Sequence, residues 1–129
     1  MDGGAPADHE RALSFEGPDE RLTVLQDTCV STAKREVLLR LMARKGDLVR
    51  ARLSGSSDSG VEIALLLHDR IATVESRAPG RFEVQLDLRL QEPGVVKLAW
   101  SVPAGVGLAC VHAKSDATDF AKLELWRPS

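Results

Sequence analysis

The stretch from residue 81 to residue 101, RFEVQLDLRLQEPGVVKLAWS, carries the clearest two-residue periodicity in the chain. Every second position from 82 to 90 is apolar, and these residues are Phe82, Val84, Leu86, Leu88 and Leu90. An extended strand places such a set on one face, whereas a helix spreads it around its circumference. Residues 92–94, Glu-Pro-Gly, combine a fixed φ with a residue that tolerates positive φ, which reverses the chain. The stretch therefore predicts a strand, a turn and a second strand that contains Trp100.

Short apolar alternations of the same kind recur along most of the chain. Beyond the first stretch, strands are predicted over 12–15, 22–25, 61–67, 71–75, 106–113 and 120–126. About eight or nine short strands with turn residues between them are typical of an antiparallel β-sandwich. We therefore expect an all-β fold, an antiparallel sandwich of jelly-roll type. A chain of 129 residues is long enough for one core, so a single domain is expected over 11–129, after a disordered tail over 1–10.

Residues 33–53, AKREVLLRLMARKGDLVRARL, allow two interpretations. As a helix, residues 37, 38, 41 and 42 would form an apolar stripe that Thr32 caps. As strands, residues 37–43 alternate into a glycine-bearing turn at 45–47, and residues 49–53 alternate out of it. A β-hairpin is favoured, because the period continues on both sides of the turn and the chain downstream is β.

The predicted strand at 61–67 is apolar on both faces, because Ala64 and Leu66 interrupt its alternation. Such a pattern is typical of a strand in the centre of a sheet that is covered on both sides.

Two cysteines, Cys29 and Cys110, lie far apart and neither belongs to a CxxC pair, which argues against the common zinc and redox motifs. No secretory signal or membrane span is recognisable, so a cytoplasmic location is expected. In that compartment two buried thiols are favoured over a disulfide.

No catalytic signature emerges from the titratable and nucleophilic residues. The three histidines, His9, His68 and His112, stand at no metal-ligand spacing from one another. Cys110 and His112 would share a strand face about 7 Å apart, too far for a base to activate a thiol. No GxSxG elbow, carboxylate pair or phosphate-binding loop is present. We expect a protein that is not an enzyme and that uses neither a metal nor a cofactor.

A basic cluster lies within the predicted hairpin. Its outward-facing members would be Arg40, Arg44, Arg50 and Arg52. Such a face would contact an acidic protein or an anionic membrane, unless neighbouring acids balance it. Nucleic acid is disfavoured, because aromatic residues make up 4% of the chain and tyrosine is absent.

The run KGDLVRARLSG, followed by PGRFEVQLDL, PGVVKLAWS and KLELW, resembles the strands of the Golgi-dynamics (GOLD) domain. The family's G-V-x-x-L-x-W strand matches Gly94, Val95, Leu98 and Trp100, and its closing strand would be 122–126. The likeness spans roughly residues 36–126, but Ser101 stands where the family usually has asparagine. The resemblance implies a β-sandwich adaptor of membrane trafficking or lipid-linked proteins, without catalytic residues.

These observations favour a non-catalytic interaction module whose partner docks on exposed strand edges or on the basic face. One alternative is a sandwich that binds a small ligand or a carbohydrate in a pocket lined by Trp100 or Trp126. Another is a subunit of a homo-oligomer.

Overall fold

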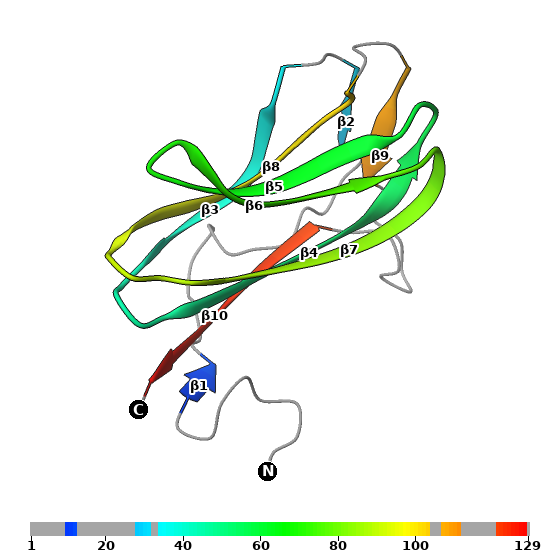
Figure 1. Ribbon diagram of the computed structural model, residues 1–129. Coiled ribbons are helices and arrows are strands. Elements are labelled where there is room, and N and C mark those ends of the chain that lie inside the picture. Colours follow the sequence, from blue (N-terminus) through cyan, green and yellow to red (C-terminus); the bar gives the residue numbers. More distant parts are fainter. Residues whose placement is uncertain (1–9, 13–27, 32–33, 104–106, 112–120, 129) are drawn as a thin grey trace.

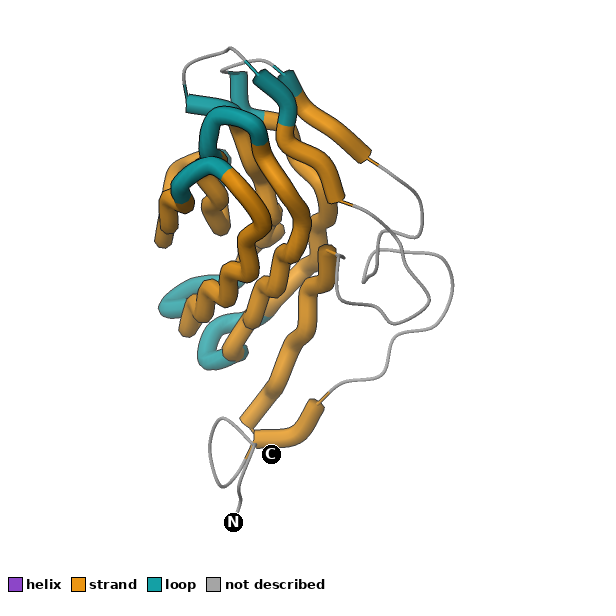
Figure 2. The backbone as a smooth tube through the Cα atoms, turned by 90° about the vertical axis from the view of Figure 1, so that its right-hand side faces the viewer, coloured by secondary structure: helices purple, strands orange, loops and turns teal. Residues whose placement is uncertain are grey.

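The computed structural model describes residues 10–12, 28–31, 34–103, 107–111 and 121–128, and that part of the chain contains strands and no helix (Figure 2). The strands are β1 (Glu10–Ala12), β2 (Thr28–Val30), β3 (Glu36–Ala43), β4 (Leu48–Ser57), β5 (Val61–Leu67), β6 (Arg70–Arg77), β7 (Gly80–Arg89), β8 (Gly94–Ser101), β9 (Ala109–Val111) and β10 (Ala121–Pro128).

The strands form two antiparallel sheets that lie one over the other (Figure 1). Sheet A has the order β1-β10-β4-β9-β2, with β7 on the other edge of β4. Sheet B has the order β3-β8-β5-β6. The predicted all-β antiparallel sandwich is confirmed.

The strands predicted at 61–67, 71–75 and 120–126 match β5, β6 and β10 within the described residues, and β5 has the predicted bounds. β2 was not predicted. Of the strand predicted at 12–15, only Ala12 is described, and it ends β1. The strand predicted at 22–25 lies outside the described residues, as do residues 1–9 of the expected tail, whereas Glu10 begins β1. The strand predicted over 106–113 contains β9.

The predicted hairpin is wrong in its pairing, although both of its strands exist. β3 pairs with β8 in sheet B, whereas β4 pairs with β7 and β10 in sheet A. The turn between them therefore passes from one sheet to the other. A two-residue period fixes which side chains point inward, but it does not fix which strand lies at each edge.

The core lies between the two sheets. Sheet A contributes alternate residues of β4, β7 and β10, and sheet B contributes alternate residues of β3, β5 and β8. The largest fully buried side chains include Trp100, Leu53, Ile63, Leu98 and Leu123. The period read from residues 82–90 therefore marks the inner face of β7, as predicted.

Asp47 ties the β3–β4 turn to the end of β10. Its carboxylate accepts hydrogen bonds from the Arg127 guanidinium at 3.0 and 2.9 Å and from the Arg44 amide at 2.7 Å, and its side chain is fully buried. Burial raises the pKa of this carboxyl, but the bonds and charges of Arg127 and Arg44 outweigh it, so the pKa lies below its ordinary 3.8. Both sheets are thus fixed to one buried ion pair.

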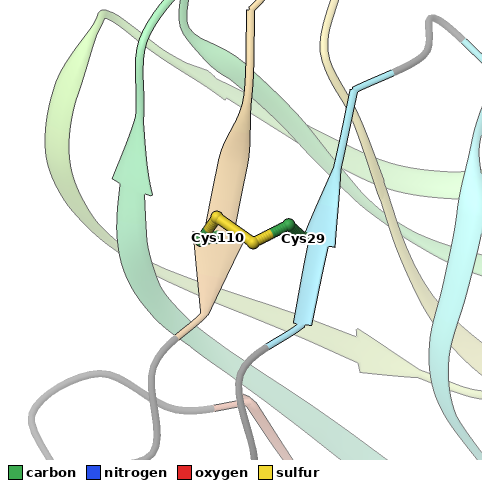
Figure 3. Close-up of a disulfide and its surroundings, with 2 residues drawn as sticks. All are labelled: Cys29 and Cys110. Carbon is green, nitrogen blue, oxygen red and sulfur yellow. A yellow bond between two sulfur atoms is a disulfide. The ribbon is translucent and has the colours of Figure 1, made fainter.

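Cys29 and Cys110 form a disulfide that joins β2 to β9, with a Cα–Cα distance of 4.1 Å (Figure 3). The expectation of two thiols is wrong. These cysteines stand opposite one another in the β2–β9 register, and only the tertiary fold brings positions 81 residues apart into that register.

Candidate docking face on sheet B

The outer face of sheet B is unusually apolar. Of the five large apolar residues that are exposed in the described part of the chain, four lie on it: Val37 (49% exposed), Met42 (64%), Ile71 (49%) and Val74 (41%). The fifth is Leu108. A solvent-facing sheet is normally polar on its outer side, so this face calls for an explanation by function.

The strand register orders the face into three rows. The first row runs Val37, Ala99, Ala64 and Val74 across β3, β8, β5 and β6. The second runs Arg40, Lys97, Leu66 and Ile71 across the same strands. Met42 and Val95 form the third. We call these ten residues the sheet B face.

Two register shifts place residues on this face that a strict alternation would turn away. A shift between Val37 and Leu39 in β3 leaves Val37 opposite Ala99 and facing outward, while Leu39 packs against the core. A shift opposite Leu65 and Leu66 brings Ile71 of β6 to the same side as Val74. Bulges of this kind re-aim side chains and are frequent at functional sites. The alternation read from the sequence wrongly grouped Val37 with Leu39.

The middle of the first row consists of two alanines. Ala64 and Ala99 are fully buried, yet neither belongs to the core cluster between the sheets. They contribute only methyl groups between the larger Val37 and Val74. Because both alanines are already covered within the chain, a partner would contact the larger side chains around them and not the alanines themselves.

A hollow of about 430 Å³ adjoins the second and third rows. Its lining is Arg40, Leu41, Met42, His68, Asp69, Val95 and Lys97. His68 and Asp69 form the β5–β6 turn with φ values of 55° and 60°, the left-handed geometry of a tight hairpin. Gly94 lets this turn approach β8, because a Cβ there would lie 2.9 Å from Leu67 Cδ1 and 3.0 Å from His68 Cε1.

Two cations of the sheet B face differ in their surroundings. Lys97 Nζ lies 2.7 Å from Asp69 Oδ1, and its hydrogen bond lowers the pKa of the Asp69 carboxyl. Arg40 is exposed, and within the described part of the chain no ion pair involves it. The two side chains stand opposite each other in the register, where like charges repel. Among the described residues, Arg40 is thus a cation without an opposing charge.

The four arginines of the predicted basic face do not share one face. Arg40 lies on sheet B and Arg44 lies at the start of the β3–β4 turn, whereas Arg50 and Arg52 lie on the outer face of sheet A. Arg50 donates to Asp87 at 2.9 and 3.1 Å, which raises the pKa of Arg50, and Arg52 lies 3.5 Å from Glu124. On sheet A, acids balance the predicted basic residues.

The two tryptophans of the predicted ligand pocket lie in different layers. Trp100 is fully buried in the core, where its indole N–H has no hydrogen-bond partner among the residues that the structure describes. Trp126 is half-buried on the outer face of sheet A, with the Arg50 guanidinium 5.2 Å from its ring centroid. The structure does not bring them together, and Arg50 covers the face that Trp126 would offer to a ligand.

A second hollow, of about 530 Å³, lies on sheet A and is lined by Arg52, Ser54, Glu83, Val84 and Gln85. His9 and His112 lie outside the described residues, and His68 lies 3.5 Å from Glu92 on the turn. Among the described residues, no three histidine, cysteine or acidic side chains are grouped as a metal site requires. No helix in that part of the chain is long and apolar enough to cross a membrane.

A scan against protein-family models finds no match for this chain, and a search of curated proteins finds no similar sequence. The GOLD resemblance stays a prediction.

Proposed function

We propose that this protein is an interaction module that binds another protein on the sheet B face. The observation that carries the proposal is the gathering of Val37, Met42, Ile71 and Val74 on one side of one sheet. They lie as two pairs on the edge strands β3 and β6, with the half-buried Leu66 and Val95 on the strands between them. Several exposed apolar side chains on one face of a sheet differ from scattered single ones, which need no explanation, and they mark interaction sites in soluble proteins.

The construction of the face supports the same conclusion. Two register shifts turn Val37 and Ile71 outward, although either residue could have been directed elsewhere by a regular strand. Such irregularities weaken pairing locally, so they are expected where a function offsets that cost. An adaptor role in trafficking, which the GOLD resemblance implies, is compatible with this face and belongs to the proposal.

The disulfide is relevant to the compartment of the cell in which the protein is located. Disulfides persist in oxidising compartments and are rare in the cytosol. The cytoplasmic location expected from the sequence would require Cys29 and Cys110 to be reduced there. Thiol titration of protein isolated from its native cells under acid quench distinguishes a disulfide from two reduced cysteines.

The test is selection from a displayed library of random peptides on the immobilised chain. Binders are then measured by fluorescence polarisation against Ile71→Lys and Val74→Lys, which place a charge on the sheet B face. Gln85→Lys is the matched control, because it adds the same charge to an exposed position on the outer face of sheet A. We expect both sheet B variants to lose binding and the control to retain it.

Two results would contradict the proposal. Binders that tolerate both sheet B substitutions would place the binding surface elsewhere. A dimer of the wild-type chain in sedimentation that becomes monomeric in Ile71→Lys would show that a second copy covers the face.

A further inference from the structure

We propose that the segment bound on the sheet B face is an acidic and apolar stretch of polypeptide, whose carboxylate pairs with Arg40. This inference rests on the proposed function and adds the chemistry of the partner. Three features of the face carry it: the charge of Arg40, the occupation of the neighbouring acids, and the apolar row that leads away from the hollow.

Arg40 is the charge on this face that calls for a counterion. It lines the hollow beside Met42 and Val95, so a carboxylate that reached it would be partly desolvated by apolar neighbours. Charge-assisted hydrogen bonds from a guanidinium to a carboxylate can be bidentate, which fixes direction as well as affinity. Lys97, opposite Arg40, adds positive potential at the same point.

The acids of the hollow and of the β5–β6 hairpin are already engaged. Asp69 holds Lys97, and Glu62, the outward-facing acid of β5, pairs with Arg35. Glu92 lies beside His68. Within the described part of the chain, the hollow has two cations and one carboxylate among its lining residues. In this proposal the partner supplies the additional carboxylate.

The same fact argues against a second copy as the occupant. If two sheet B faces packed together about a two-fold axis with their hollows facing, each would present Arg40 and Lys97 to a hollow whose one carboxylate, Asp69, already pairs with Lys97. Like charges in such an interface cost free energy and select against that partner.

The apolar part of the partner is defined by the row that contains Arg40. Leu66 and Ile71 follow Lys97 on β5 and β6, and neighbouring strands lie about 4.8 Å apart. The distance from Arg40 to Ile71 is then roughly 14 Å, which an extended segment of about five residues spans. One short segment can pair with Arg40 at one end and bury a large apolar side chain on Ile71 at the other.

The experiment is a charge swap within the same peptide selection. Binders from the wild-type chain should be enriched in Asp or Glu within a few positions of Leu, Ile or Phe. Arg40→Glu should weaken them roughly tenfold, as expected for a close interfacial ion pair, and binding should return when the acid of the peptide is replaced by Lys. Arg77→Glu is the matched control: it makes the same charge change at an exposed residue at the other end of sheet B, where its pair with Glu75 is exposed.

The outcomes separate this inference from the proposed function. Binders that are lost in Ile71→Lys but show no enrichment in acids and no response to Arg40→Glu would overturn the inference and leave the docking face intact. Binders that respond neither to Ile71→Lys nor to Arg40→Glu would overturn both the inference and the proposed function. Flotation with vesicles of phosphatidylserine and phosphatidylcholine is a further arm, and flotation that depends on Arg40 without acidic peptide binders would assign the charge to lipid headgroups and overturn the inference.

Discussion

The outer faces of the two sheets differ in how charged and apolar side chains are arranged on them. Sheet A carries cations opposite acids, with Arg50 bound to Asp87 and both Arg52 and Lys122 close to Glu124. Sheet B carries exposed apolar side chains, and its Arg40 has no opposing acid within the described part of the chain. The inner faces of both sheets share one apolar core. Packing of the shared core therefore explains the inner faces of both sheets, whereas the outer faces are where the two sheets differ.

This contrast predicts two classes of substitution. Those outside the sheet B face should change stability and not binding, and those on it should change binding and not stability.

The disulfide gives the largest expected effect. The Cys29→Ser/Cys110→Ser variant opens a loop whose ends are 81 residues apart, and the chain-entropy relation puts the loss at about 4.5 kcal/mol. Guanidinium chloride unfolding measures it, and peptide binding on the sheet B face should persist under conditions where the variant is folded. An unchanged unfolding midpoint would mean that the bond is absent from the wild-type protein in solution.

The next effect belongs to the buried ion pair between Asp47 and Arg127. Asp47→Ala removes a fully buried carboxylate and leaves Arg127 and the Arg44 amide without their acceptor, which should cost roughly 3 kcal/mol. Thermal unfolding reports the loss. Ser56→Ala, a half-exposed position on β4, is the control and should change the free energy of unfolding by less than about 0.5 kcal/mol.

The same pair predicts a dependence on pH. The folded pKa of Asp47 is lowered below its ordinary 3.8, so the ionised carboxylate stabilises the fold at pH values above 3.8 and this contribution is lost as the pH falls through the lower, folded value. Wild-type stability should therefore fall more steeply with acid than that of Asp47→Ala. Parallel curves for the two proteins would show that Asp47 titrates alike in the folded and unfolded states.

A smaller effect is expected from the exposed charges of sheet A. Arg50→Met keeps the aliphatic part of the side chain but removes the bonds to Asp87 and the contact with the Trp126 ring. Because the pair is partly exposed, the loss should be about 1 kcal/mol. Urea unfolding in low and high salt measures it, and the difference from wild type should shrink as salt screens the pair. A peptide selected on the wild-type chain should bind this variant normally, and weaker binding would blur the division between the two faces.

The sequence predicts the fold class well because a two-residue period depends on local chain geometry alone. It does so for residues 82–90 and for β5. It misses the partners of each strand, because β3 and β4 are neighbours in the chain but belong to different sheets. It misses the disulfide for the same reason, since the register of β2 against β9 is a tertiary property.

Much of the sheet B face could not be predicted from the sequence, for a more specific reason. Val37 and Ile71 reach it through register shifts, and one extra residue in a strand inverts every alternation that follows. One signal was present: Ala64 and Leu66 make β5 apolar on both faces. That pattern predicted a strand covered on both faces, and the structure buries Ala64 fully and Leu66 in part.

The smallest expected change in stability belongs to the sheet B face and completes the contrast with sheet A. Ile71→Thr and Val74→Thr keep the β-branched shape that suits a strand while removing methyl or ethyl groups that are already 49% and 41% exposed. Each should alter the free energy of unfolding by less than about 0.5 kcal/mol, because little buried surface is lost. The same substitutions should weaken a selected peptide several-fold, since the contact with the partner loses apolar area. A loss of stability as large as that of Arg50→Met would show that these side chains serve the fold, and the division between a structural face and a binding face would then fail.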